Sequence, residues 1–183
     1  LTRAKGGFLS KRTAAVAGLP EFERLRDIGK GIKDHTLAHL DFYLEEYEAQ
    51  VVKAGGQVHW AHTADDARAA VLEICRTAGA RTVTKGKSMI SEELGINDHL
   101  EAHGIEPVET DLGEYILQIR KEPPSHIIGP AFHLNREDWE ESFRRTHTDL
   151  PKDRVFHERR DIMTEARTKL RSKFLAADVG ITG

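Results

Sequence analysis

Short apolar runs alternate with amphipathic stretches along most of the chain. Four runs have the composition of β-strands and begin about 20 to 24 residues apart: 57–61, 81–85, 105–110 and 125–129. The stretches between them carry apolar residues at the three- and four-residue spacing of amphipathic helices. Because parallel neighbours in a sheet need helical crossovers, this alternation predicts an α/β fold with an open, mainly parallel, doubly wound sheet.

Polar and glycine residues mark the ends of several predicted helices. Thr63, with Asp66 three residues later, has the pattern of a helix start, and Gly79 has the pattern of its end. Asn135, also followed three residues later by an aspartate, predicts a second capped start. Asn97 is a candidate cap within the second crossover, and Pro151 is a candidate start for a further helical stretch.

The segment before the first predicted strand is helical in pattern. Between residues 20 and 53, apolar side chains recur at helical spacing, with a break suggested by Gly29 and Gly31. We therefore predict an N-terminal helical lead-in over residues 1–55 and an α/β domain over residues 56–183. The final run "VGITG" is typical of the approach to another strand, so we expect this domain to be incomplete at the C-terminus.

Composition narrows the class of protein. The 183 residues include 30 acidic and 27 basic side chains, a balance that gives no general attraction to nucleic acid or to anionic lipid. No apolar run approaches the roughly 20 residues that span a bilayer, so we expect no membrane insertion. Cys75 is the only cysteine, which excludes an internal disulfide framework and favours a reduced, cytoplasmic setting.

The tripeptide Gly86-Lys87-Ser88 is also how a phosphate-binding P-loop ends. That motif needs a glycine five positions before Gly86, where this chain has Arg81, and residues 81–85 are themselves a predicted strand. The P-loop interpretation is therefore rejected. A strand end with lysines and a serine before a helix start still predicts an anion site, although solvated lysines and a serine that only caps the helix are an equal alternative.

In open parallel sheets, ligands bind beyond the carboxyl ends of the strands. The polar residues that fall at this edge are our ligand-binding candidates: Lys85, Lys87, Ser88, Glu109, Thr110, Asp111, Glu114, His126 and His133. Neighbouring carboxylates can raise one another's pKa and act as general bases. The alternative is that Asp111 caps a helix and Glu114 lies near its positive end. No catalytic residue is assigned.

Two other patterns have plain structural explanations. The histidine pairs His35/His39 and His99/His103 have the spacing of one helix face, but no third ligand is evident, so we predict no metal site. The segment 144–173 is rich in lysine and arginine, which could dock an acidic partner. The alternative is the solvated face of an amphipathic helix.

Several long stretches together resemble a known family. "KGKSMISEELGINDHLEAHGIEPVETDLGEYILQI" and "PPSHIIGPAFHLNRED" are similar to the LUD domain of lactate-utilisation proteins, and specifically to its B-type iron-sulfur group. The resemblance implies a fold like the NagB/RpiA/CoA-transferase group and a role in a complex that oxidises L-lactate to pyruvate and passes electrons onward. The family's motifs fall on Lys85, Lys87, Ser88, Glu92, Glu93, Glu109 to Glu114, His126, Pro130, Ala131 and His133.

The same resemblance implies cofactors and partners. Members of the family continue past the element at Gly180–Gly183 into cysteine motifs, so we expect 4Fe-4S clusters in the full-length parent and none in this chain, which has one cysteine. Sister subunits of a lactate-utilisation complex and a small carboxylate or phosphate ligand are the expected partners. An incomplete sheet exposes an edge, which predicts poor solubility, strand exchange or dimerisation, and a homodimer is therefore a further candidate assembly.

Two alternatives to an electron-transfer subunit stay open. One is a stand-alone small-molecule enzyme of the same fold group. The other is an assembly module whose loops contact a sister subunit.

Overall fold

The computed structural model of this chain describes residues 5–125 and 129–183. Its contacts divide the chain into two compact units, Leu1–His59 and Trp60–Gly183. The first unit contains the π-helical turn η1 (Lys5–Leu9) and helices α2 (Ser10–Ala17), α3 (Phe22–Ala38) and α4 (Leu40–Lys53). The domain boundary that we predict after residue 55, between the helical lead-in and the α/β domain, stays a prediction.

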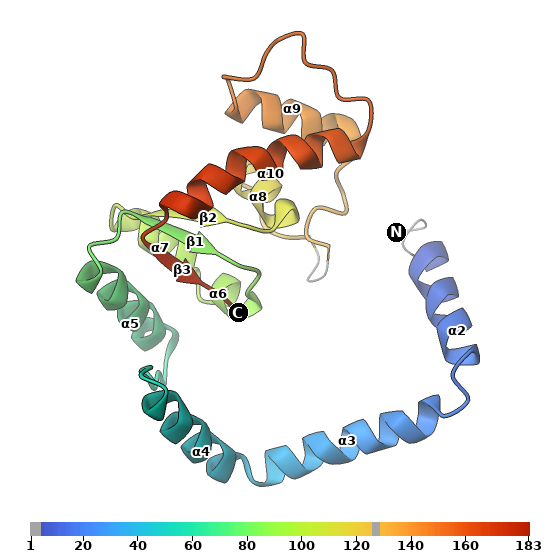
Figure 1. Cartoon of the computed structure of the whole chain (residues 1–183), viewed down its shortest axis with the longest axis vertical. Helices are drawn as coiled ribbons and strands as arrows, with labels where there is room; N and C mark the ends of the chain where they lie inside the picture. Colours follow the sequence, from blue (N-terminus) through green and yellow to red (C-terminus); the bar gives the residue numbers. More distant parts are fainter. Residues whose placement is uncertain (1–4, 126–128) are drawn as a thin grey trace. The chain divides into compact units, whose positions relative to one another are not determined.

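The second unit contains helices and strands in alternation (Figure 1). Its helices are α5 (Ala64–Thr77), α6 (Met89–Glu93), α7 (Ile96–Ala102), α8 (Leu112–Arg120), α9 (Arg136–Thr146) and α10 (Arg159–Ala176). Its strands are β1 (Thr82–Lys85), β2 (Glu106–Glu109) and β3 (Val179–Ile181).

The three strands form one parallel sheet in the order β2-β1-β3. The predicted open parallel α/β sheet is therefore confirmed, and two of its predicted strands, 81–85 and 105–110, are observed as β1 and β2. The expectation that the final "VGITG" approaches a strand is also confirmed, because β3 pairs with β1 from Val83 to Lys85.

Of the other two predicted strands, one is wrong and one lies mostly outside the described residues. Residues 57–61 form no strand in the described structure, and the side chain of Trp60 is 56% exposed. Apolar composition alone did not make a strand there, because strand formation needs a pairing neighbour and a surface to cover. Of the run 125–129, residues 126–128 lie outside the described residues, and neither Ser125 nor Gly129 is in a strand.

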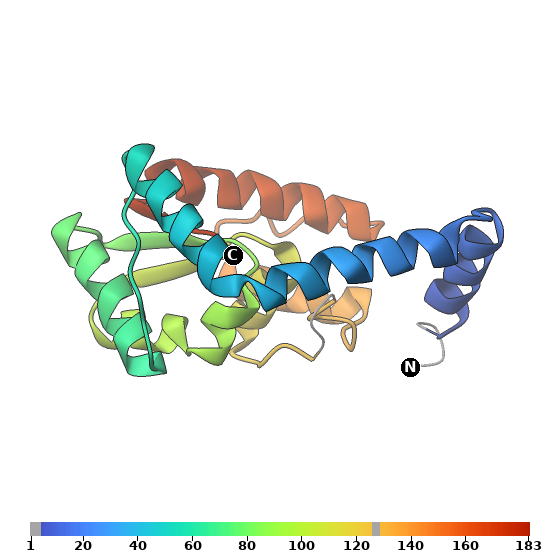
Figure 2. The same ribbon diagram turned by 90° about the horizontal axis from the view of Figure 1, so that it is seen from below.

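The sheet separates two apolar clusters. On one side, Val83 packs with residues of α5 and α7, among them Cys75 and Leu100. On the other side, Val108 packs with residues of α8, α9 and α10, among them Phe143. Figures 1 and 2 show α10 running along one side of the sheet, with α8 and α9 beside it. The domain is thus layered helix–sheet–helix, as a doubly wound fold requires.

Local capping follows the sequence at the starts of α5 and α9 and at the end of α5. Thr63 with Asp66 and Asn135 with Asp138 each form a capping box at the start of α5 and α9. Gly79 follows α5 with a φ of +64°, a conformation that glycine adopts without strain.

Three local predictions were wrong. Helix α3 continues through Gly29 and Gly31 to Ala38, since an isolated glycine costs only about 1 kcal/mol in a helix and does not break its hydrogen bonds. The residue before α7 is Gly95, and Asn97 lies inside the helix. The last helix, α10, begins at Arg159 and not near Pro151, because a capping box at Glu158 fixes its start. None of the described helices combines the length and the apolar character needed to cross a bilayer.

Candidate site at the carboxyl ends of β1 and β2

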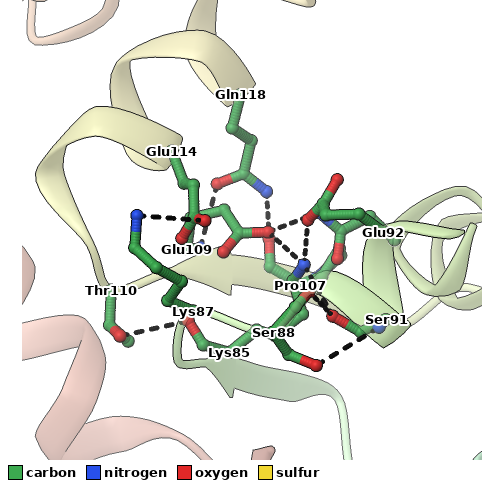
Figure 3. Close-up of polar contacts among 11 residues, drawn as sticks. Lys85, Lys87, Ser88, Ser91, Glu92, Pro107, Glu109, Thr110, Glu114 and Gln118 are labelled. Carbon is green, nitrogen blue, oxygen red and sulfur yellow. Dashed lines mark hydrogen bonds and ion pairs between the residues drawn. The ribbon is translucent and has the colours of Figure 1, made fainter. Parts of the chain in front are cut away.

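Polar side chains at the carboxyl ends of the neighbouring strands β1 and β2 form one cluster (Figure 3). Strand β1 leads into α6 and α7 on one face of the sheet, whereas β2 leads into α8 on the other. Where adjacent parallel strands send their loops to opposite faces, the loops part and leave room for a ligand. Figure 3 shows the polar side chains that gather at this point.

Lys85 is the centre of the cluster. It is the last residue of β1, and it lies on the same face as buried Val83 because strand side chains alternate. Its side chain is only 1% exposed. The Nζ atom lies 2.8 Å from Glu109 Oε1, donates to Ser91 Oγ at 3.1 Å, and forms a further ion pair with Glu92. A buried cation of this kind requires such partners.

Glu109 is the partner that the sheet itself supplies. Lys85 and Glu109 are paired residues in the parallel register of β1 and β2, so their side chains leave the same face. Glu109 Oε1 also accepts a hydrogen bond from Asn97 Nδ2 at 2.7 Å. The second carboxylate oxygen, Oε2, is buried and has no hydrogen-bond partner among the described residues. An unpartnered buried oxygen is costly and is therefore available to a ligand or a water.

The ion pairs set the protonation state of Lys85. Burial opposes the cation, but the hydrogen bonds and charges of Glu109 and Glu92 outweigh burial, and the pKa of Lys85 is raised. Lys85 is therefore a positive charge already neutralised by carboxylates. It organises the cluster and is not a free cation for an incoming anion.

Lys87 is the more accessible cation. Its side chain is 37% exposed, and its Nζ lies 3.6 Å from Asp111 Oδ1 and 3.5 Å from Glu114 Oε1. These are long contacts for ion pairs. Asp111 Oδ1 is already the N-cap of α8 and accepts a hydrogen bond from Gly113 N. Lys87 can therefore exchange a loosely held carboxylate of the chain for that of a ligand.

Glu114 is the candidate proton acceptor. Its side chain is 11% exposed, and its Oε2 has no hydrogen-bond partner among the described residues. Burial raises its pKa, although Lys87 pulls in the opposite direction and the nearby carboxylates of Glu109 and Asp111 add to the rise. A carboxylate with a raised pKa beside a lysine is suited to taking a proton from a bound molecule.

The remaining ligand-binding candidates do not take part in the ion pairs of Lys85 and Lys87. Thr110 donates through its backbone N and its Oγ1 to Lys85 O, so it ties the ends of β1 and β2 together. Ser88 caps α6, as the structural alternative proposed. His133 contacts Glu122 and Ser125 and has no described contact with the lysines. His126 lies outside the described residues.

Sequence reasoning missed three members of the cluster. Asn97 was predicted only as a helix cap, and neither Ser91 nor Gln118 was among the ligand-binding candidates. The side chain of Gln118 accepts a hydrogen bond from Glu109 N at 3.0 Å and donates one to Pro107 O at 2.7 Å. It therefore supplies hydrogen-bond partners to backbone groups at the unpaired edge of β2. The available signal was spacing, because Gln118 follows Glu114 by four residues and shares its helix face.

The described residues do not fit an iron-sulfur cluster. Such clusters are normally held by four cysteines, whereas Cys75 is alone and fully buried beside Val83 in an apolar cluster. Burial raises the pKa of its thiol, and it is the thiolate that binds metal. Within residues 5–125 and 129–183, no group of three or more His, Cys, Asp or Glu side chains could hold a metal ion.

Comparison with known proteins identifies the family. Residues 44–183 match the LUD domain, which is most of the chain. The chain belongs to the LUD domain family. This confirms the resemblance seen in the sequence.

Curated relatives align with this chain over almost its whole length. Proteins named "Lactate utilization protein B" are 41% identical in Oceanobacillus iheyensis over 100% of this chain, 41% identical in Bacillus subtilis over 95%, and 45% identical in Macrococcus caseolyticus over 90%. The chain spans only 37%, 36% and 34% of their respective lengths. No solved structure matches it significantly.

Proposed function

We propose that this chain is the LUD-domain part of a B-type lactate-utilisation protein, a cytoplasmic subunit of a complex that oxidises L-lactate to pyruvate. The observation that carries the proposal is the identity of about 41% over the full chain with a relative of that name. Oxidation of lactate releases electrons and protons, so such a complex needs a path for both. Any 4Fe-4S cluster on the electron path would be held by residues outside this chain.

Within that complex, we propose that the polar cluster at the ends of β1 and β2 binds a small carboxylate. Lys87 would pair with the carboxylate of the ligand, because it is the exposed cation of the cluster and its own ion pairs are long. Glu114 would accept a proton, because its carboxylate is largely buried and its pKa is raised. Lys85 and Glu109 would hold the strand ends in place beneath the ligand.

The cellular role is tested by growth. Deletion of the gene in its host should abolish growth on L-lactate as sole carbon source and leave growth on glucose unchanged. The wild-type gene should restore growth, and Lys87→Ala should restore it poorly. Lys30→Ala is the matched control, since Lys30 is also an exposed lysine in an ion pair, with Asp34. Normal growth of the deletion strain on L-lactate would refute the cellular role.

Ligand binding separates this function from the alternatives. Calorimetry with L-lactate and with pyruvate should show binding to the wild-type protein and at least tenfold weaker binding to Lys87→Ala, as expected when a charge-assisted contact is lost. Absence of binding, combined with tight capture of a sister subunit, would favour an assembly module. Preferential turnover of a phosphorylated sugar would favour a stand-alone enzyme.

A further inference from the structure

A second concave site lies in the same unit, on the other face of the sheet. It is a groove of about 710 Å³ between α10 and the loop that leads from β2 into α8. Thr110 and Asp111 line one end, and Arg167 and Arg171 line the wall that α10 provides. Ligand pockets typically have volumes of roughly 300 to 1,000 Å³, and a three-carbon acid would fill little of this one.

The guanidinium groups of Arg167 and Arg171 are exposed on the wall of the groove. Arg167 and Arg171 are four residues apart, so they share a face of α10. Neither guanidinium forms an ion pair or a hydrogen bond with any residue that the structure describes. The two lysines of the same stretch of α10 do have partners, because Lys169 pairs with Asp149 and Lys173 pairs with Glu106.

The charge balance of the groove is positive. Among the described residues that line it, Asp111 alone has a carboxylate, and this side chain already has Lys87 Nζ at 3.6 Å and Gly113 N at 2.9 Å. Paired guanidinium groups with no carboxylate in contact favour a phosphate, because the planar fork of arginine matches phosphate oxygens. A simple inorganic anion would satisfy this charge but not the rest of the groove.

The remaining wall is apolar. Leu112, Met163 and Phe174 line the groove together with the arginines, and Phe174 is 40% exposed. A partly exposed aromatic ring and a half-buried thioether side chain beside two cations suit a ligand that has a ring system and phosphate groups. We propose that this groove binds an organic phosphate of nucleotide size, with its phosphates on Arg167 and Arg171 and its ring against Met163 and Phe174.

The proposed ligand would lie next to the lysine cluster. The two sites meet at Asp111, which lines the groove and lies beside Lys87. A nucleotide-sized molecule and a small carboxylate could therefore be held at the same sheet edge at one time. The inference goes beyond the proposed function, because it concerns a different ligand and stands whether or not the chain acts on lactate.

Calorimetry with the full-length protein at low ionic strength tests the proposal. The probes are ADP and FMN, with adenosine and inorganic pyrophosphate as partial ligands. We expect at least one of the two nucleotides to bind with a Kd below about 1 mM and the partial ligands to bind at least tenfold more weakly. Arg167→Ala and Arg171→Ala should each weaken nucleotide binding by roughly tenfold to a hundredfold, because each removes charge-assisted hydrogen bonds.

Arg160→Ala is the matched control, since Arg160 is an exposed arginine of α10 that does not line the groove. It should leave nucleotide affinity unchanged. Circular dichroism of each variant shows whether the helix content is retained, and Arg167→Lys, which keeps the charge, should recover part of the affinity. Failure of both nucleotides to bind would overturn the proposal, as would binding that is the same in the arginine variants. Binding of a polyglutamate peptide in place of nucleotides would reassign the groove to an acidic protein segment.

Discussion

The two units of the chain both contain amphipathic helices, but they differ in how far the apolar side chains of those helices are buried. In the first unit, α2, α3 and α4 contain no buried residue, and large apolar side chains such as Ile32 and Phe42 are 63% and 61% exposed. In the second unit, α10 places Ile162 and Leu170 at 1% exposure in a cluster with α8 and α9. Amphipathic spacing therefore specifies a helix in both units, but burial requires a second surface.

The ion pairs differ in the same way. Arg26–Glu23 and Lys30–Asp34 in α3 are pairs within one helix between exposed side chains. Lys85–Glu109 joins two strands and is almost fully buried. Exposed pairs contribute little to stability, whereas removal of one partner from a buried pair leaves an uncompensated charge in the interior.

The largest expected effect is the loss of the buried cation. Lys85→Met should lower the free energy of unfolding by about 3 to 5 kcal/mol, because Glu109 would remain charged and buried. Lys30→Met should lower it by less than about 0.5 kcal/mol, as expected for an exposed pair within a helix. Urea unfolding followed by circular dichroism measures both values.

A double variant shows whether the isolated carboxylate is the cause. Lys85→Met/Glu109→Gln should be more stable than Lys85→Met, because the amide removes the charge and keeps an acceptor for Asn97. Equal losses for the two lysine variants would contradict the contrast between the units.

The next effect concerns apolar packing. Leu170→Ala should lower the free energy of unfolding by about 2 to 5 kcal/mol, because it opens a cavity in the cluster between α8, α9 and α10. Leu37→Ala, at a side chain that is 69% exposed in the first unit, should change it by less than about 0.5 kcal/mol. A large loss for Leu37→Ala, measured by the same unfolding curves, would show that the first unit buries this face in solution.

The smallest effect is a dependence on pH. His147 Nε2 lies 2.8 Å from the hydroxyl of Tyr115, and burial lowers the pKa of His147 below its ordinary 6.5. The folded state therefore favours neutral His147, and its contribution to stability is present above pH 6.5 and is lost as the pH falls through the folded-state pKa. We expect the Tm of the wild-type protein to fall more steeply on acidification below that pH than the Tm of His147→Gln.

The first unit offers a matched histidine–tyrosine pair. His35 Nε2 lies 3.1 Å from the hydroxyl of Tyr43, but His35 is exposed. His35→Gln should leave the slope of Tm against pH as it is in the wild-type protein. Parallel curves for wild type and His147→Gln would show that the His147–Tyr115 contact does not link folding to pH.

The sequence predicts which polar residues lie at the sheet edge but not which of them contact one another. Lys85 and Glu109 end β-type runs, and Lys87, Asp111 and Glu114 follow them, so parallel strands bring all five to one edge. Which of them meet depends on the register, and the pairing of Lys85 with Glu109 in neighbouring strands is visible only in the structure. The burial of Lys85 could not be foreseen, since lysine is usually solvated.

The sequence alone determined where several helices begin and end. Capping boxes, positive-φ glycines and helical spacing act over three or four residues, so the starts of α5 and α9 and the end of α5 follow from the residues themselves. Tertiary structure decided the rest. Strand pairing depends on contacts between residues far apart in the chain, and no local pattern encodes such contacts. The same holds for the hydrogen bond from Asn97, a predicted cap, to Glu109 and for the groove beside Arg167.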